Sequence, residues 1–175
     1  MKRRFLAALS MIAVAVLAQP AAANAATAGS TGTGSFCNTS LSRHTTVCFD
    51  SMSKLQAHRS AAADYDLVAM YNWVNYNQGG GYNILSGDHV CTASYSNNDY
   101  ELYDLSIYSY NNGINMNNTF TSVSTYTSNP SKCDIKLYDG FTLTGASSVF
   151  IDRCTDLTKC VATNWSDRAS SFVLS

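Results

Sequence analysis

Two ten-residue segments of this chain have the same chemical outline, and this internal repeat is the feature that most restricts its fold. The first, NMNNTFTSVS, covers residues 115–124, and the second, NWSDRASSFV, covers residues 164–173. Each copy has an Asn, a large apolar residue, two polar residues, two variable residues and then two hydroxyl residues. A repeat of this kind predicts two related structural units that pack on one another. It also gathers side-chain oxygens on a tight turn, and a hard cation such as Ca²⁺ requires oxygen ligands.

The repeated string is similar to the calcium-binding signature of the βγ-crystallin Greek-key motif. That signature reads Asn or Asp twice, two variable residues, Ser or Thr, and then Ser. Residues 117–122 (NNTFTS) fit it at every defined position, whereas residues 166–171 (SDRASS) have Ser166 where Asn or Asp is expected. Trp165 precedes the second copy, as a Trp often does in this family, and Met116 has the equivalent place in the first.

The family has a second mark near the start of each motif: a Tyr, four residues, an aromatic residue, one residue and a Gly. Residues 138–145 (YDGFTLTG) keep the Tyr and the Gly but have Leu143 for the aromatic residue. Residues 71–79 (YNWVNYNQG) keep the aromatic as Tyr76 but have Gln78 at the Gly position, followed by Gly79. The resemblance covers residues 66–175. It implies an all-β fold of two Greek-key motifs packed as a sandwich, with motif one over residues 66–128 and motif two over residues 133–175.

The resemblance also implies two calcium sites, in which the polar loop of one motif meets the first hairpin of the other. Carried over to this chain, the first site has Asn117, Asn118, Thr121 and the carbonyl of Thr119 facing Asp139. The same strings form Asx and Ser/Thr turns without any metal, so turn formation is the alternative reading of these residues.

The second implied site has Asp167, Ser170 and the carbonyl of Arg168 facing Asn72. Each site has one carboxylate, so we expect one or two weakly bound ions, with dissociation constants of about 10⁻⁴ to 10⁻³ M. We expect the first site to be the better one, because Arg168 adds a positive charge to the second and Ser166 is a poorer oxygen donor.

The first 25 residues have the features of a secretory signal peptide. Lys2, Arg3 and Arg4 precede an apolar run, and residues 23–25 (ANA) form a small-x-small cleavage site. The run is too short for a comfortable membrane span. Removing it takes three of the eleven basic residues and none of the twelve acidic ones, which leaves a formal charge of −4. We therefore expect a secreted, extracellular monomer with no nucleic-acid or membrane partner.

Six cysteines lie in the exported part, and an even count in an exported chain predicts disulfides. Six cysteines allow fifteen pairings. We prefer two short loops and one longer link that ties motif one to the junction with motif two. A zinc site is the alternative, but no Cys-x-x-Cys pair occurs. The preferred pairs are Cys37 with Cys48, Cys91 with Cys133, and Cys154 with Cys160.

Before the β domain, composition predicts two further segments. Residues 26–36 are rich in Ala, Gly, Ser and Thr and predict a flexible linker. Residues 37–65 form an N-terminal extension in which residues 51–63 favour a short helix, capped by Asp50 or Ser51. From residue 66 onward, apolar and polar residues alternate and predict strands. The expected strands are residues 66–74, 80–86, 102–110 and 121–127 in motif one, and 134–139, 146–152, 157–163 and 170–174 in motif two.

The sequence favours a non-catalytic protein in which calcium stiffens the fold, with a structural or stress-related role outside the cell. Small secreted bacterial proteins of this fold include metalloprotease inhibitors, and this is the alternative function. The loop closed by Cys154 and Cys160 would then present Leu157 to a pocket of an extracellular metalloprotease. Catalysis is the third class, but neither a Gly-x-Ser-x-Gly nor a His-Glu-x-x-His string occurs. The histidines are His44, His58 and His89.

Overall fold

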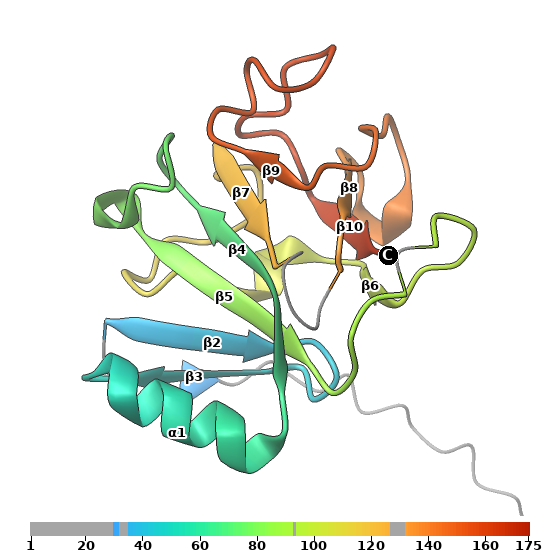
Figure 1. Cartoon of the computed structure of the whole chain (residues 1–175). Helices are drawn as coiled ribbons and strands as arrows, with labels where there is room; N and C mark the ends of the chain where they lie inside the picture. Colours follow the sequence, from blue (N-terminus) through green and yellow to red (C-terminus); the bar gives the residue numbers. More distant parts are fainter. Residues whose placement is uncertain (1–29, 32–34, 93, 127–131) are drawn as a thin grey trace, which may run out of the picture.

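The computed structural model describes residues 30–31, 35–92, 94–126 and 132–175, and within them the chain forms short strands, one α-helix and three 3₁₀ helices (Figure 1). The strands are β1 (Ser30–Thr31), β2 (Phe36–Ser40), β3 (Thr45–Phe49), β4 (Tyr65–Tyr71), β5 (Tyr82–Gly87), β6 (Tyr100–Leu102), β7 (Ser122–Thr125), β8 (Ile135–Tyr138), β9 (Arg153–Cys154) and β10 (Ser171–Leu174). The helices are α1 (Met52–Ala62), η1 (Gln78–Gly80), η2 (Leu105–Ile107) and η3 (Phe141–Leu143).

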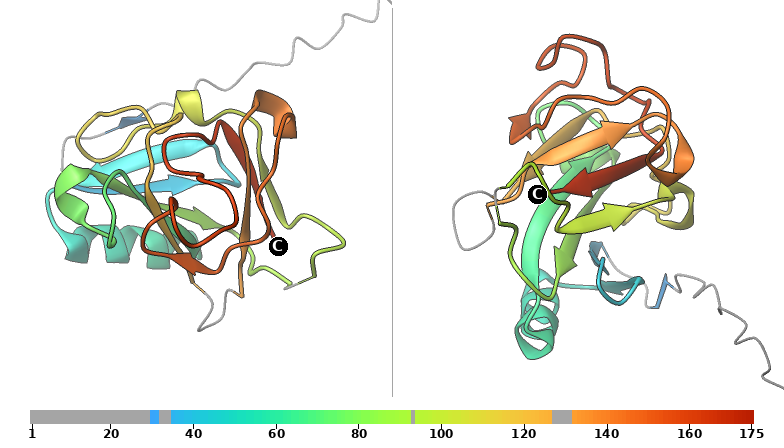
Figure 2. Two further views of the ribbon diagram at one scale, coloured as in Figure 1. Left: turned by 90° about the horizontal axis from the view of Figure 1, so that it is seen from above. Right: turned by 90° about the vertical axis from the view of Figure 1, so that its right-hand side faces the viewer.

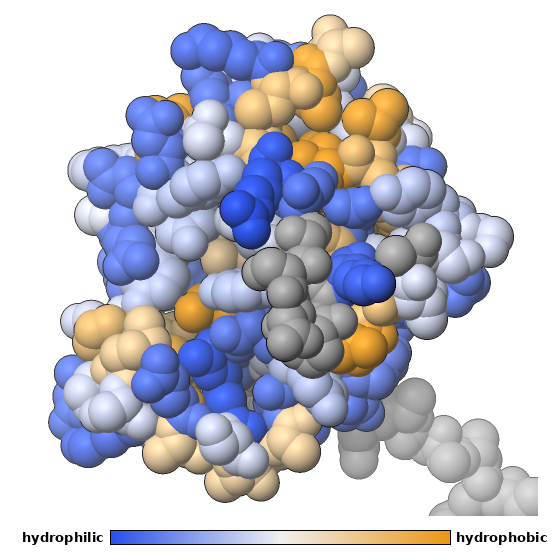
Figure 3. Space-filling model, in the orientation of Figure 1, coloured by the Kyte–Doolittle hydropathy of each residue, from blue (hydrophilic) through white to orange (hydrophobic). Residues whose placement is uncertain are grey.

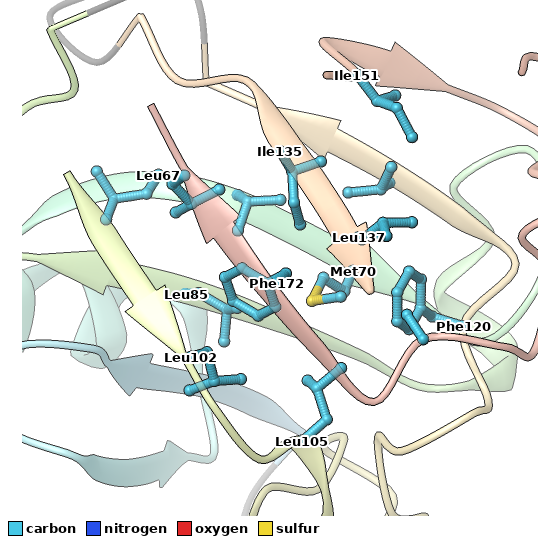
Figure 4. Packing of buried hydrophobic residues seen from close by; sticks show 14 of the residues in the cluster. Leu67, Met70, Leu85, Leu102, Leu105, Phe120, Ile135, Leu137, Ile151 and Phe172 are labelled. Atoms are coloured by element: carbon cyan, nitrogen blue, oxygen red, sulfur yellow. The ribbon is translucent and has the colours of Figure 1, made fainter. Parts of the chain in front are cut away.

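Within these residues the strands form a seven-stranded sheet, in the order β1-β3-β2-β5-β4-β7-β9, and a three-stranded sheet, in the order β6-β10-β8. The core lies between the sheets. Leu67, Met70 and Leu85 of the larger sheet and Leu137 and Phe172 of the smaller sheet belong to one buried cluster (Figure 4). Removing such apolar surface from water is the main favourable term in folding. The all-β sandwich expected from the sequence is confirmed.

Each half of the sandwich contributes its third strand to the sheet of the other half. β6, from the first half, pairs with β10 of the second. β9, from the second half, pairs with β7 of the first. The remaining strands stay with their own half: β4 pairs with β5 and β7, and β8 pairs with β10. The exchange joins the halves through backbone hydrogen bonds as well as through the core.

Most of the predicted strands are present, but two of those in motif two are wrong. Residues 157–163 form turns rather than a strand, and the third strand of motif two is the earlier pair of residues in β9. Residues 146–152 make only isolated bridges, from Ser147 to Tyr138 and from Ile151 to Ile135. In motif one, the strand predicted at residues 102–110 is the shorter and earlier β6, followed by η2. Irregular loops therefore replace much of the regular structure predicted for motif two.

The N-terminal extension is part of the larger sheet and adds more than the expected helix. β2 and β3 form a hairpin, and β2 pairs in parallel with β5. α1 has the predicted position, with Ser51 as the N-cap whose hydroxyl accepts a hydrogen bond from the backbone N–H of Lys54. Figures 1 and 2 show α1 beside β2 and β3, at the end of the molecule away from β8 and β10. The predicted signal peptide lies outside the described residues, as does most of the predicted linker.

The apolar residues of the repeat supply the centre of the core. Met116 and Trp165 occupy equivalent places and are at most 1 % exposed. Phe120 and Ala169 are a second equivalent pair and are fully buried. On the face shown in Figure 3, hydrophobic residues form separate patches among polar ones. Within the described residues, no helix has the length and apolar character that crossing a membrane requires.

The three expected disulfides are present, and together they use all six cysteines: Cys37–Cys48, Cys91–Cys133 and Cys154–Cys160. The first closes the β2–β3 hairpin, where the two cysteines are direct cross-strand partners. The second links the two halves across 42 positions of sequence. Covalent links of this kind restrict the unfolded chain and so stabilise the fold.

Candidate functional site

The two repeated polar loops lie against each other, related by an approximate two-fold symmetry. The backbone N–H of Asn118 donates to the carbonyl of Ala169 at 3.0 Å, and that of Asp167 donates to the carbonyl of Phe120 at 3.1 Å. Asn118 and Asp167 both have left-handed backbones, with φ of 54° and 53°. Asn and Asp adopt this conformation more readily than most residues, which explains the second residue of the polar pair in each copy.

Each loop also holds the first hairpin of its own half. The N–H of Thr121 donates to the carbonyl of Tyr71, and the N–H of Ser170 donates to that of Tyr138, both at 2.9 Å. One residue later, the hydroxyls of Ser122 and Ser171 donate at 2.6 Å to the carbonyls of Trp73 and Gly140, respectively. One backbone and one side-chain contact are thus repeated in the two halves.

These contacts group the candidate ligands differently from the sequence expectation. The hydroxyl of Thr121 donates to the carbonyl of Asn72 at 3.0 Å, so Thr121 lies at the hairpin of its own half and away from the place facing Asp139. Asp167 lies against Phe120, the neighbour of Thr121. We call Asn72, Thr121 and Asp167 the Asp167 cluster. It combines residues of both halves: the Asn72 carbonyl and the Thr121 hydroxyl come from one half, and Asp167, whose backbone N–H bonds to Phe120, comes from the other.

The second group of oxygens surrounds the side chain of Asn118. One terminal atom of this amide lies 2.6 Å from the carbonyl oxygen of Arg168, 3.1 Å from that of Ala169 and 3.2 Å from the hydroxyl of Ser170. As a nitrogen, this atom donates to oxygens. As an oxygen, it completes a set of four oxygens that a cation would satisfy. We call Asn118, the carbonyls of Arg168 and Ala169, and Ser170 the Asn118 cluster.

Asp139, which was expected to be the carboxylate of the first site, is occupied by other contacts. Arg168 donates to its Oδ2 from Nη2 at 2.8 Å and from Nε at 3.3 Å. Its Oδ1 accepts from the N–H of Ala146 at 2.7 Å. The hydrogen bonds from Arg168 are the main reason that the pKa of Asp139 is lowered. Arg168 also lies over the Trp165 ring, 4.6 Å from its centroid, so Asp139 serves to anchor this arginine.

Asp167 has the opposite electrostatic environment. Burial raises its pKa, because desolvation disfavours the charged carboxylate. Among the described residues it forms no ion pair, and the hydroxyl of Ser166 lies 3.4 Å from its Oδ2. An exposed carboxylate without a counter-charge among the described residues is accessible to a cation.

Asn117 and Thr119 belong to the turn that carries Asn118. The N–H of Asn117 donates to Oδ1 of Asn115 at 2.9 Å, and the N–H of Ser166 donates to Oδ1 of Asn164 at 2.8 Å in the second loop. These are the metal-free turns that the sequence offers as the alternative reading. Oδ1 of Asn117 is nevertheless buried without a hydrogen-bond partner, which leaves one further oxygen in the loop unsatisfied.

The described residues hold no group of three or more His, Cys, Asp or Glu side chains that could bind a metal. The two clusters are therefore made of amide, hydroxyl and carbonyl oxygens with at most one carboxylate. Such a donor set suits Ca²⁺ and excludes the softer, nitrogen- or sulfur-liganded metals. Sequence reasoning named every side chain of both clusters; the carbonyl of Ala169 is the candidate ligand that it missed.

The loop predicted to present Leu157 to a protease is packed against the body of the protein. Leu157 is fully buried, and its N–H donates to the carbonyl of Thr121 at 2.8 Å. Its own carbonyl accepts from the N–H of Trp165 at 3.0 Å. The expectation that Leu157 fills an external specificity pocket is therefore wrong. Leu157 instead packs in the core and bonds through its backbone to Thr121 of the first polar loop.

A Ser, an Asp and a His also meet near the end of β5, but their hydrogen bonds run in the wrong order for catalysis. The hydroxyl of Ser42 donates to Oδ1 of Asp88 at 2.7 Å, and Nδ1 of His89 lies 2.8 Å from the same oxygen. A nucleophilic Ser must instead donate to the His that takes its proton. Ser42 Oγ also accepts from the N–H of Asp88, and His89 stacks on Tyr100. These hydrogen bonds stabilise the turn at Asp88 and His89 that follows β5.

Comparison with known proteins gives similarity in fold alone. Neither a protein-family model nor a curated protein sequence matches the chain significantly. Three solved structures align with 63 % of the chain. One, described under the evolution of the eye-lens βγ-crystallin domain fold, has 19 % identity and a TM-score of 0.43 over 85 % of its own length.

The other two are bacterial. A βγ-crystallin domain from Flavobacterium johnsoniae has 21 % identity and a TM-score of 0.40 over 94 % of its length. A double mutant of a βγ-crystallin domain from Clostridium beijerinckii has 17 % identity and a TM-score of 0.41 over 97 % of its length. The chain is thus an all-β sandwich similar in fold to βγ-crystallin domains.

Proposed function

We propose that this protein is secreted, binds calcium at the Asp167 and Asn118 clusters, and uses the ion to hold the two halves of its sandwich together. Two observations carry the proposal: oxygens of the second loop surround the amide of Asn118 in the first, and a backbone hydrogen bond brings Asp167 beside Phe120, the neighbour of Thr121, in the other half. At the Asn118 cluster, three oxygens of the second loop surround an amide of the first. An ion bound there contacts both halves, so it stabilises the native state relative to the unfolded chain.

The Asp167 cluster is the stronger of the two in this proposal. It has a carboxylate without an ion pair in the described part of the chain, whereas Asp139 is neutralised by Arg168. This reverses the order expected from the sequence, because Asp139 is paired with Arg168. Few carboxylates and open loops place the affinity in the range of extracellular modules, with dissociation constants of about 10⁻⁴ to 10⁻³ M.

Thermal unfolding of the mature protein with and without calcium tests the proposal. At about 10 mM Ca²⁺, affinities of this order stabilise the fold by roughly 1.4 to 2.7 kcal/mol. For a domain of this size that corresponds to a rise in melting temperature of about 3 to 10 °C. Magnesium at the same concentration should have a smaller effect, because it loses its water ligands reluctantly. No shift, or equal shifts with the two ions, would contradict the proposal.

Asp167→Asn separates a binding defect from a folding defect. The substitution should remove most of the calcium-induced shift. Without calcium it should leave the melting temperature unchanged or raise it at neutral pH, because the fold disfavours the charged carboxylate. Asp50→Asn changes the charge by the same amount at an exposed site beside Lys54. This control should respond to calcium like the unchanged protein.

Calcium sites and three disulfides both fit a protein that works outside the cell, where calcium is abundant and thiols oxidise. We propose that residues 1–25 direct export and are then removed. N-terminal sequencing of the exported protein should begin at Ala26. Cell-associated protein that retains its first residues would argue against export. The role that follows is a structural one outside the cell, without catalysis.

A further inference from the structure

The loop between β4 and β5 carries an exposed tryptophan on a fixed support. Trp73 is 52 % exposed, whereas Trp165, the other tryptophan, is buried. A Cβ atom added to Gly80 would lie 2.3 Å from Cγ of the Trp73 indole, and one added to Gly79 would lie 3.3 Å from its Cζ3. The indole therefore lies directly against the glycine backbone and leaves its other side open. In Figure 1 this loop projects at the left of the molecule.

Several contacts hold the loop in place. The carbonyl of Trp73 accepts from the hydroxyl of Ser122 at 2.6 Å. The N–H of Asn75 donates to the carbonyl of Thr155 at 2.7 Å, which ties the loop tip to the second half. The side chains of Asn72 and Asn112 both donate to the carbonyl of Gly80, at 3.0 and 2.9 Å. A fixed aromatic surface loses little conformational entropy when it binds a ligand.

Trp73 lines an open surface pocket of about 500 Å³, a volume typical of small-molecule sites. The described lining combines this aromatic ring with one aliphatic side chain, three amides and one hydroxyl, and it has no charged side chain. The residues are Asn72, Trp73, Val74, Asn75, Asn77 and Thr121.

This chemistry selects a neutral ligand with one apolar face and a polar rim. The carboxamide of Asn75 has no hydrogen-bond partner among the described residues, and Asn77 uses only its Oδ1, which accepts from the N–H of Gly79 at 2.8 Å. Amides offer both donors and acceptors, which suits hydroxyl groups. A pyranose ring presents C–H groups on one face, which match the electron-rich face of an indole, and hydroxyls around its edge.

We propose that the Trp73 pocket binds a neutral hexopyranose unit of a glycan, with the sugar ring stacked on the indole and its hydroxyls bonded to the Asn75 and Asn77 amides. A nucleotide fits less well because its phosphates require cations that the described lining lacks. The pocket shares Asn72 and Thr121 with the Asp167 cluster, but stacking on Trp73 does not require a metal. The glycan proposal is therefore tested independently of the calcium proposal.

Calorimetric titration of the mature protein with maltohexaose, cellohexaose and chitohexaose tests the proposal, both in calcium and in a chelator. At least one oligosaccharide should bind with a dissociation constant of about 1 mM or tighter. Binding should change the fluorescence of Trp73, because it is the exposed tryptophan. Absence of binding to all three at about 10 mM would overturn the proposal.

Three variants and one control, Tyr103→Ala, locate the site. Trp73→Ala should weaken binding about tenfold or more, and Trp73→Phe should restore part of it, because stacking is the main contact. Gly80→Ala keeps the tryptophan but should weaken binding, because the added Cβ displaces the indole. Tyr103→Ala removes an aromatic ring of similar exposure elsewhere and should bind like the unchanged protein. Equal binding by the unchanged protein and a folded Trp73→Ala would overturn the proposal.

Discussion

Left-handed backbone residues show which parts of the two loops the sequence could predict. Asn118 and Asp167 have positive φ at equivalent places, and the Asn/Asp positions of the repeat pointed to such a turn. Thr142 and Leu143 also have positive φ, of 55° and 58°. Branched and bulky residues rarely adopt this conformation, so no local signal marks them. Tertiary contacts decide their conformation: the N–H of Leu143 donates to the hydroxyl of Ser171 at 3.1 Å.

The sequence resemblance predicted a glycine at position 145, and the structure supplies the physical reason that glycine is needed there. The motif resemblance singled it out, and its φ is +80°. A Cβ at this position would lie 2.1 Å from Oδ1 of Asp139, which itself accepts from the N–H of Ala146. Glycine is therefore required by both the backbone conformation and the closeness of the carboxylate.

The contacts of Asp88 with Ser42 and His89 predict how the stability of the fold depends on pH. Hydrogen bonds from Ser42 and then His89 are the main causes that lower the pKa of Asp88 to about 2. The folded pKa lies below the unfolded value, so the stabilisation is complete above the unfolded pKa and is lost as the pH falls through the folded one. Asp88→Asn should therefore lower the melting temperature at neutral pH, and the difference should shrink between about pH 4 and pH 2.

The size of this effect is limited because Asp88 is exposed to solvent, and we expect at most about 1 kcal/mol. Ser42→Ala removes the largest cause of the low pKa and should reproduce part of the difference with the same pH dependence. Melting curves of the three proteins across the acid range measure it. A difference that grows as the solution becomes more acidic would show that the sign is wrong.

At the scale of elements, buried polar residues explain why two strands were missed. Asn38, Thr39 and Ser40 of β2 are almost fully buried. Their partners lie on other strands: the Asn38 amide donates to the carbonyl of Ile84 in β5, and the Thr39 hydroxyl lies 2.8 Å from that of Thr46 in β3. Hydrophobic alternation cannot indicate a strand whose buried face is polar, because the pattern counts apolar residues alone.

The loop from Cys154 to Cys160 was wrongly predicted as partly strand and partly inhibitory surface. Its short length and its disulfide were predictable, but the burial of Leu157 was not. That burial depends on contacts with Thr121 and Trp165, which come from the first polar loop and from the start of the second. A leucine between two cysteines fits an exposed tip and a buried anchor equally well until its neighbours are known.

Leu157→Ala tests the buried position. Truncating a fully buried leucine should lower the free energy of unfolding by about 2 to 5 kcal/mol. Thr158→Ala, at the exposed neighbouring position, should change it by much less, although it removes a hydrogen bond to Asp156. Urea denaturation of both variants measures the difference. Equal, small effects would mean that Leu157 is not part of the core.

At the scale of the whole molecule, the duplication in the sequence predicted the paired architecture, but it did not predict how the halves are joined. The local pattern gave β4, β5, β7, β8 and β10 nearly where they occur. The exchange of β6 and β9 between the sheets depends on pairing over long sequence distances, which a local pattern does not contain. The same is true of the extension, whose β2 pairs with β5 about 46 positions later.

This arrangement also places the candidate ligands. Each polar loop lies between the hairpin of its own half and the polar loop of the other. The sequence named the side chains of both clusters but placed Thr121 opposite Asp139, whereas its hydroxyl lies at the carbonyl of Asn72 and Asp139 is paired with Arg168. An ion at either cluster would link the halves at the same place as the backbone hydrogen bonds from Asn118 and Asp167.

Crystals of the mature protein grown in about 10 mM calcium, with the ion located by its anomalous scattering, test this account most directly. The account predicts an ion in the Asp167 cluster, bound by Asn72 and Thr121 of one half and Asp167 of the other, and a second, weaker one beside Asn118. Well-ordered crystals with neither cluster occupied, or with an ion held by residues of one half alone, would contradict it.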